Sequence, residues 1–239
     1  MRASPVMTGE ETRVALVTGA ASGIGAAVCG RLATSGWRLA GIDLRPPAVE
    51  LALEADVSDR AAVEAAVERV RSELGEPSVL VTAAGYYEMA AVAEIGAERW
   101  HRMLAVHLGG VANTCWAVVP AMLRAGSGTI VTISSELALA GGAGDCHYCA
   151  AKGAILGFTR SLGAELAPRG IRVNGVAPGP TDTPLLADDS PWRAPDYVDT
   201  LPLRRLVRPE EVAETVSLLV EEGGYFAGQT LSPNAGAVI

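Results

Sequence analysis

Short apolar runs alternate with longer stretches of helical periodicity along most of the chain. The apolar runs have the length of strands and occupy residues 14–17, 38–42, 51–55, 79–81, 129–133, 171–176 and 229–231. Between them, residues 59–74 space Val and Ala at three and four positions with charges between, which is typical of an amphipathic helix on a sheet. Because parallel strands need a crossover that is usually a helix, this alternation predicts an α/β fold with a mostly parallel sheet and helices on both faces.

The regular pattern begins at residue 13 and predicts one domain over residues 13–239. Residues 1–12 are polar, contain Pro5 and Gly9, and lack periodicity, which predicts a flexible leader. The segment from Pro178 to Pro209 contains seven prolines, so we expect a long loop with short helices, and a substrate-covering role, at about residues 180–208. Ligands of such sheets bind outside the carboxyl ends of the strands.

Composition narrows the class of protein. The formal net charge of -8 disfavours a nucleic-acid-binding surface, which needs clustered Lys and Arg. The N-terminus has no pattern of a signal peptide and no apolar run approaches the length of a membrane span, so we expect a cytoplasmic protein without a membrane partner. Cys146 and Cys149 form a CxxC, but without a second ligand pair they are expected to be ordinary thiols, and no metal site is predicted.

A glycine-rich turn, TGAASGIG at residues 18–25, follows the first predicted strand and precedes a helical stretch at residues 26–33. Such glycines let the backbone approach a pyrophosphate at a helix N-terminus, although an ordinary glycine-rich bend is the alternative. Asp43 ends the second predicted strand, where a carboxylate would bind an adenine-ribose diol and repel a 2'-phosphate. Arg45 could neutralise a phosphate, but Ser22 stands where a second basic residue would help. The pattern favours NAD(H) over NADP(H).

Tyr148 and Lys152 are four residues apart, which places both on one helix face. A protonated Lys152 is expected to stabilise the Tyr148 phenolate and lower the pKa of Tyr148 towards neutrality, so that the tyrosine serves as a general acid/base. Ser135 lies just past the predicted strand at residues 129–133, where its hydroxyl could hold a substrate oxygen. Each residue alone has a simpler explanation, as a helix face or a turn serine; the combination predicts catalysis.

In this order and spacing, the motifs resemble the short-chain dehydrogenase/reductase family from residue 13 to the C-terminus. The resemblance implies a single-domain, Rossmann-type doubly wound parallel sheet of about seven strands, and an oxidoreductase that transfers a hydride between NAD(H) and a secondary alcohol or ketone. It implies the catalytic residues Ser135, Tyr148 and Lys152. It also implies the cofactor-binding positions Thr18, Gly19, Ser22, Gly23, Ile24, Gly25, Asp43, Asp56, Val57, Ala84, Gly85, Tyr148, Lys152, Pro178, Gly179, Thr181 and Thr183.

The chain departs from the family pattern at two positions. Thr82 begins the Thr-Ala-Ala-Gly segment where the family has asparagine, and we expect only a structural adjustment there. His107 stands where the family commonly has the asparagine of a proton relay. His107 could take over the relay and add a titration near neutrality, or it could be a buried, hydrogen-bonded helix residue.

The substrate pocket implied by the resemblance mixes acidic and apolar side chains. Its members would be Glu136, Leu137, Asp145, Cys146, His147, Leu185, Leu186 and Trp192. Glu136 could bind a polar or cationic substrate group, with a salt bridge or a solvated turn as the alternative. We expect a small-molecule alcohol or ketone as substrate.

Two other functions stay open at this point. One is a ketoreductase of polyketide or fatty-acid type acting on a 3-oxoacyl thioester, with Arg169, Arg204 and Arg205 facing an acyl carrier protein. The other is a catalytically silent dinucleotide-binding regulator, for which His107 is the only support. The apolar C-terminal residues 235–239 favour subunit contacts, so we expect a homotetramer or homodimer.

Overall fold

Seven parallel strands form one sheet in the computed structural model, which describes residues 13–239. The leader expected at residues 1–12 lies outside the described residues. The strand order is β3-β2-β1-β4-β5-β6-β7. The strands are β1 (Val14–Thr18), β2 (Arg38–Asp43), β3 (Leu51–Glu54), β4 (Val79–Thr82), β5 (Gly128–Ile133), β6 (Ile171–Val176) and β7 (Thr230–Leu231). Every pairing is parallel, which confirms the expected doubly wound Rossmann-type sheet.

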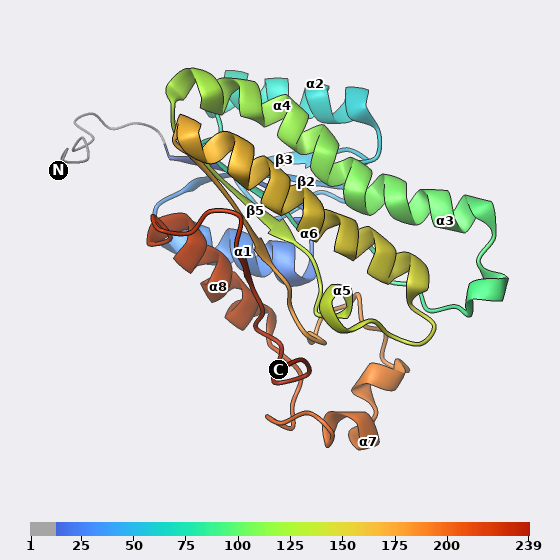
Figure 1. Cartoon of the computed structure of the whole chain (residues 1–239). Coiled ribbons are helices and arrows are strands. Elements are labelled where there is room, and N and C mark those ends of the chain that lie inside the picture. Colours follow the sequence, from blue (N-terminus) through green and yellow to red (C-terminus); the bar gives the residue numbers. More distant parts are fainter. Residues whose placement is uncertain (1–12) are drawn as a thin grey trace.

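Helices cover both faces of the sheet: α2, α4 and α6 lie on one face, and α1 and α8 on the other (Figure 1). The shorter helices α3, α5 and α7 lie towards the carboxyl ends of the strands, with α7 inside the proline-rich segment after β6 (Figure 1). The helices are α1 (Gly23–Thr34), α2 (Arg60–Glu73), α3 (Ala97–Leu104), α4 (Gly110–Ala125), α5 (Leu137–Ala140), α6 (Cys146–Leu166), α7 (Pro195–Val198) and α8 (Pro209–Glu221).

Strand β1 contributes side chains to the apolar cores on both faces of the sheet. All five of its residues are buried, so it appears in the sequence as a continuous apolar run. Successive side chains of a strand point to opposite faces: Val14 and Leu16 pack under α2, α4 and α6, whereas Ala15 and Val17 pack under α1 and α8. From β1 the chain continues to β2 and β3 on one side of the sheet, and β4 then lies on the other side of β1. At this change of direction a doubly wound sheet opens a crevice for a ligand.

The observed boundaries differ from the sequence expectations by a few residues. The third strand ends at Glu54, and the first helix begins at Gly23 because the glycine turn leads directly into it. The helix expected at residues 59–74 is α2, for which the Asp59 carboxylate accepts hydrogen bonds from the amides of Ala61 (2.9 Å) and Ala62 (3.2 Å) as an N-cap.

The expectation that no apolar stretch approaches the length of a membrane span is wrong on length and composition. A helical stretch of 29 residues, Ala97–Ala125, includes α3, a π-helical turn (Ala105–Gly109) and α4, and it is long and apolar enough to cross a bilayer. In the fold, α4 packs on α2 and on strands β4 and β5. Its apolar stripe is therefore used inside this domain, as in the core helix of an α/β protein.

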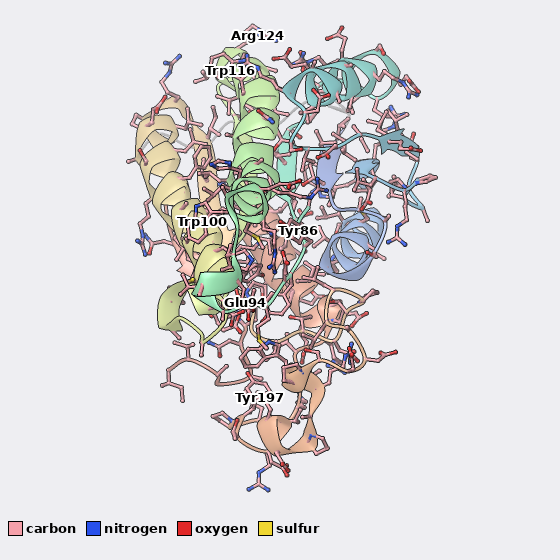
Figure 2. The ribbon with its side chains drawn as sticks, turned by 90° about the vertical axis from the view of Figure 1, so that its right-hand side faces the viewer. Tyr86, Glu94, Trp100, Trp116, Arg124 and Tyr197 are labelled. Carbon is pink, nitrogen blue, oxygen red and sulfur yellow. The ribbon has the colours of Figure 1, made fainter. Side chains whose placement is uncertain are left out.

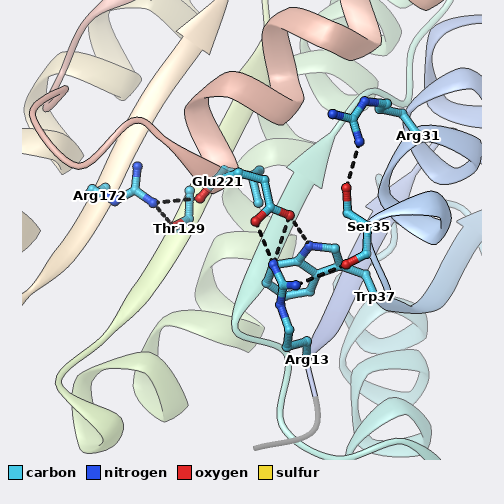
Figure 3. Close-up of polar contacts among 8 residues, drawn as sticks. Arg13, Arg31, Ser35, Trp37, Thr129, Arg172 and Glu221 are labelled. Carbon is cyan, nitrogen blue, oxygen red and sulfur yellow. Dashed lines mark hydrogen bonds and ion pairs between the residues drawn. The ribbon is translucent and has the colours of Figure 1, made fainter. Parts of the chain in front are cut away.

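Helix α8 is joined to the amino ends of the strands by charged groups (Figure 3). The Glu221 carboxylate accepts hydrogen bonds from Trp37 Nε1 (2.6 Å) and from the Arg13 guanidinium (2.6 Å to Oε2). Arg172 of β6 donates to the carbonyls of Leu219 (2.6 Å) and Val220 (3.0 Å), two of the last carbonyls of the helix. The last carbonyls of a helix have no partner inside it, so the guanidinium satisfies them as a hydrogen-bond donor. Its positive charge also interacts favourably with the negative end of the helix dipole.

Replacing Arg172 by Leu is expected to lower the free energy of unfolding by about 1–3 kcal/mol, because the two helix carbonyls lose their donors in a partly buried place. Urea unfolding followed by circular dichroism measures this. The matched control is Arg169→Leu at an exposed position. Equal stability of the two variants would show that the Arg172 contacts contribute nothing.

Candidate active site

A cavity of about 670 Å³ opens at the carboxyl ends of the strands. It is formed by loops that follow β1, β2, β4, β5 and β6, together with α6 and the segment at residues 180–208. The structure brings into its lining most of the residues predicted from the sequence: Gly19, Ser22, Gly23, Ile24, Gly25, Asp43, Asp56, Val57, Ala84, Gly85, His107, Ser135, Glu136, Leu137, Tyr148, Lys152, Pro178, Gly179, Thr181, Thr183, Leu185, Leu186 and Trp192.

Four predicted residues lie outside this lining. Thr18 ends β1, and its hydroxyl accepts a hydrogen bond from the amide of Ala84 (3.2 Å), so it positions the loop after β4. Asp145, Cys146 and His147 are absent from the lining: Asp145, buried just before α6, accepts a hydrogen bond from the Tyr87 hydroxyl (2.7 Å), and His147 lies about 100° around α6 from Tyr148. The expectation that these three line the substrate pocket is wrong.

His147 packs instead against α3. Its ring stacks on Trp100 with the centroids 6.4 Å apart, and its Nε2 lies 3.8 Å from a carboxylate oxygen of Glu88. Among residues 13–239 neither ring nitrogen has a hydrogen-bond partner. Figure 2 shows Trp100 on this side of the molecule, while Trp116 and Arg124 lie at the opposite end of the long helices from the cavity.

The glycine turn has the geometry of an anion cradle. Gly19 has a φ of 69°, and a Cβ there would lie 2.7 Å from the amide nitrogen of Ala84; a Cβ on Gly25 would lie 2.0 Å from the carbonyl oxygen of Gly19. Ser22 is the N-cap of α1 in extended conformation, its side chain makes no capping bond, and the first helical turn has no acidic residue. The amides of this helix end are thus free for an anion such as a pyrophosphate.

Asp43 closes the cradle. One oxygen of its carboxylate accepts a hydrogen bond from the amide of Ala21 (3.0 Å) and the other from the amide of Arg45 (3.2 Å). This places the carboxylate at the edge of the turn, in a lining that also includes Asp56. Hydrogen bonds from the hydroxyl and the amide of Ser58 lower the pKa of Asp56.

At the other end of the cavity, the loop after β6 lies against the loop after β5. The amide of Glu136 donates to the carbonyl of Pro178 (3.0 Å). A Cβ on Gly179 would lie 2.6 Å from Asn234 Cα, so this position needs glycine for close packing. The glycine turn, Asp43 and the loop after β6 together fit the two halves of a nicotinamide dinucleotide. This cofactor supplies or accepts a hydride when bound.

Ser135, Tyr148 and Lys152 are brought together from two elements and are all buried. The Lys152 ammonium donates to the carbonyl of Ile133 at the end of β5 (2.9 Å) and lies 5.8 Å from the centre of the Tyr148 ring. The Ser135 hydroxyl donates to Glu136 Oε2 (2.8 Å). A phenol, a hydroxyl and an ammonium at one end of a cavity form an arrangement that can bind an oxygen and exchange a proton with it.

Burial controls the protonation of these groups. It lowers the pKa of Lys152 to about 8. It raises the pKa of Tyr148, and the Glu136 carboxylate raises it further, although the Ser135 hydroxyl opposes the rise. The expectation that Lys152 brings the Tyr148 pKa towards neutrality is therefore wrong for this arrangement, and Tyr148 holds its proton at neutral pH.

His107 lies in the π-helical turn and is 2 % exposed. Its Nε2 lies 2.8 Å from the carbonyl oxygen of Tyr86, and its ring meets the Tyr148 ring edge-on with the centroids 5.5 Å apart. Burial, with the nearby Lys152 charge, lowers the pKa of His107 to about 3. The hypothesis of a titration near neutrality is wrong, because the imidazole stays neutral there; its Nδ1 has no hydrogen-bond partner among the described residues.

The sequence interpretation missed Tyr86 and Tyr87, which line the cavity after β4. The Tyr87 hydroxyl donates to Asp145 Oδ1 (2.7 Å) and accepts from Trp192 Nε1 (2.7 Å), so it connects the start of α6 to the proline-rich segment. Its ring also contacts the Tyr148 ring edge-on at 5.1 Å. Their place directly after Gly85, at the carboxyl end of a strand, was the available signal.

This fold and cavity define an oxidoreductase that binds a nicotinamide dinucleotide. The family described as short chain dehydrogenase matches residues 13–194. The chain belongs to the short-chain dehydrogenase/reductase family, which confirms the resemblance.

Three similar proteins extend this comparison. Nodulation protein G of Azospirillum brasilense is 36% identical, covering 94% of this chain and 97% of that protein. Cis-4-hydroxycyclohexanecarboxylate dehydrogenase of Sinomonas cyclohexanicum is 38% identical, covering 94% and 96%. The solved structure of a 3-ketoacyl-(acyl-carrier-protein) reductase from Brucella melitensis complexed with NADH has a TM-score of 0.89 and 28% identity, covering 96% of this chain and 99% of that chain.

Glu136→Gln is expected to stabilise the protein above neutral pH. Burial raises the pKa of Glu136 from 4.5 to about 7, so the folded state holds a proton that the unfolded state has lost. The parent therefore loses stability as pH rises from about 4.5 through 7, by on the order of 3 kcal/mol, whereas the Gln variant does not. Urea unfolding at several pH values measures the difference, with exposed Glu94→Gln as control; parallel curves for parent and Glu136→Gln would contradict it.

Proposed function

We propose that this protein transfers a hydride between NAD(H) and the carbinol or carbonyl carbon of a small secondary alcohol or ketone, with Tyr148 as general acid/base. Ser135 holds the substrate oxygen, and Tyr148 gives a proton to that oxygen in reduction or takes it in oxidation. Lys152 supplies a positive charge behind the phenol. The observation that carries the proposal is the convergence of these three buried side chains at one end of the cavity that also contains the glycine cradle.

The protonation states agree with this division of roles. Because the Tyr148 pKa is raised, the phenol is a proton donor at neutral pH, as reduction requires. Oxidation requires Tyr148 to lose its proton, so its rate should rise with pH. The lid side of the cavity, with Leu186 and Trp192, excludes water from the transfer.

NAD(H) is proposed over NADP(H) on the position of Asp43. Its carboxylate stands at the edge of the glycine turn, held by the amide of Ala21, where it would accept hydrogen bonds from a ribose diol. A 2'-phosphate at the same place would be repelled by this carboxylate. The relative from Brucella melitensis was solved with NADH, which supports the same choice.

A ketoreductase acting on a 3-oxoacyl thioester is the second candidate, favoured by the similarity to the Brucella melitensis reductase. Arg205 is directed elsewhere, since its guanidinium pairs with Glu211 at 2.7 Å. Arg169 and Arg204 do not line the cavity. The small-alcohol substrate is preferred because the net charge of -8 disfavours an acidic carrier protein. A silent regulator is disfavoured because Ser135, Tyr148 and Lys152 are all retained.

We also propose a homotetramer or homodimer in the cytoplasm. Support comes from Ile239, which is fully exposed at the apolar end of the chain, and from four cysteines without disulfides in the described structure.

Tyr148→Phe is expected to lower kcat by about 10²- to 10⁴-fold, because it removes the proton donor and leaves the ring packing intact. Nicotinamide absorbance across a panel of secondary alcohols and ketones measures turnover, and protein fluorescence measures NADH binding, which should be unchanged. Tyr225→Phe, at an exposed tyrosine, is the control. A Tyr148→Phe enzyme as fast as the parent would refute the role of this residue.

Asp43→Ser is expected to lower the ratio of kcat/KM with NAD to that with NADP by about tenfold or more, because a charged hydrogen-bond partner of the ribose and its repulsion of a 2'-phosphate are both removed. The matched control is Glu54→Ser, since Glu54 is the exposed register partner of Asp43 at the end of β3. An unchanged ratio would remove the argument for NAD(H).

A further inference from the structure

Glu136 is a buried carboxyl group on the wall of the cavity, next in sequence to Ser135. It is 7 % exposed. Its Oε2 accepts the hydrogen bond of the Ser135 hydroxyl at 2.8 Å. The lining of the cavity also includes the apolar side chains of Leu137, Leu186 and Trp192. A carboxyl group in such a place loses its hydration and normally has a charged or hydrogen-bonding partner.

Within residues 13–239, no Lys or Arg forms an ion pair with Glu136. The Lys152 ammonium donates to the Ile133 carbonyl instead. The titratable groups that interact electrostatically with Glu136 are a carboxyl group, two phenols and a thiol: Asp145, Tyr148, Tyr197 and Cys149. Burial, with the Asp145 charge, raises the pKa of Glu136 to about 7. Hydrogen bonds from the Ser135 hydroxyl and from nearby backbone amides oppose this rise, so the cavity wall carries a carboxyl group that has hydrogen-bond donors but no cation among the described residues.

The position of this acceptor relative to the reaction is set by Ser135. In the proposed function Ser135 lies against the reacting oxygen, and the carboxyl group lies within one hydrogen bond of its hydroxyl. A group on the substrate carbon next to the reacting carbon is close to the reacting oxygen and so falls within reach of the carboxyl group. A hydroxyl or ammonium there would donate to Glu136, whereas a methylene would offer the carboxylate no further donor.

We propose that Glu136 selects substrates that carry a hydrogen-bond donor on the carbon adjacent to the reacting carbon: vicinal diols, 2-amino alcohols and the corresponding α-hydroxy or α-amino ketones. The inference rests on the proposed function. In oxidation of a diol, Tyr148 first gives its proton to solvent; the carbinol C–H bond then breaks and its hydride passes to NAD, the O–H proton passes to the Tyr148 oxygen, and the carbinol becomes a carbonyl. The neighbouring donor is not consumed. A 3-oxoacyl thioester has a methylene at that position and is disfavoured.

The test compares matched alcohols in oxidation with NAD at about pH 8, where Glu136 is largely ionised. The substrates are cyclohexanol, the cis and trans isomers of 1,2-cyclohexanediol, and those of 2-aminocyclohexanol. In the parent, kcat/KM for at least one isomer of the diol or amino alcohol is expected to exceed that for cyclohexanol by about tenfold or more. The preference should grow as pH rises through about 7, because ionised Glu136 is the stronger acceptor.

Glu136→Leu should bring this ratio close to one by removing the acceptor. Glu136→Gln should keep a preference for the diol and lose the preference for the ammonium, because an amide oxygen accepts a hydrogen bond without a charge. NADH binding measured by fluorescence shows that each variant is folded, and exposed Glu94→Gln is the matched control (Figure 2). A ratio that is unchanged in Glu136→Leu, or a parent that prefers cyclohexanol, overturns the selection by Glu136 while the proposed function stands. A parent that oxidises none of these alcohols, nor any other secondary alcohol in the panel above, would refute the proposed function itself.

Discussion

Two buried hydrogen bonds between α6 and the end of β5 position the chemistry of the cavity. The Lys152 ammonium donates to the carbonyl of Ile133 at 2.9 Å, and the Ser134 hydroxyl donates to the carbonyl of Lys152 at 2.8 Å. Ser135 follows Ser134 directly, and Tyr148 lies one helical turn before Lys152, so these bonds determine how the two reacting groups face each other. The cost is the burial of an ammonium, seen in the lowered pKa of Lys152.

The electrostatic character of the cavity changes from one end to the other. At the end of β1, amides of a helix N-terminus and the Asp43 carboxylate provide fixed donors and one negative charge, which suits a pyrophosphate and a ribose diol. At the end of β5, burial dominates: it keeps Tyr148 protonated and His107 neutral, and it leaves Glu136 near its titration point at neutral pH. The end of the cavity at β1 therefore suits an anion and a ribose diol through preformed dipoles, whereas burial at the β5 end sets the protonation states of the side chains.

Much of the fold was predictable because the inner strands of a parallel sheet are buried on both faces and each crossover helix is buried on one. Continuous apolar runs such as residues 14–17 and the three-and-four spacing in α2 express these two constraints directly. The glycine turn, Asp43, Ser135, Tyr148 and Lys152 were predictable for a similar reason, since each must occur at a set place relative to a strand end. His147 was mispredicted because adjacency in sequence to Tyr148 does not give a shared helix face.

The sequence alone determined the parallel α/β architecture, the glycine cradle and the placement of Tyr148 and Lys152 on one helix face, because these depend on local periodicity, on glycine conformations and on the i, i+4 spacing of the two residues. Only the tertiary structure decided the protonation of Tyr148, His107 and Glu136, since a pKa depends on burial and on charges brought from distant segments. The same holds for the contact of Trp192 with Tyr87, 105 residues away in the chain.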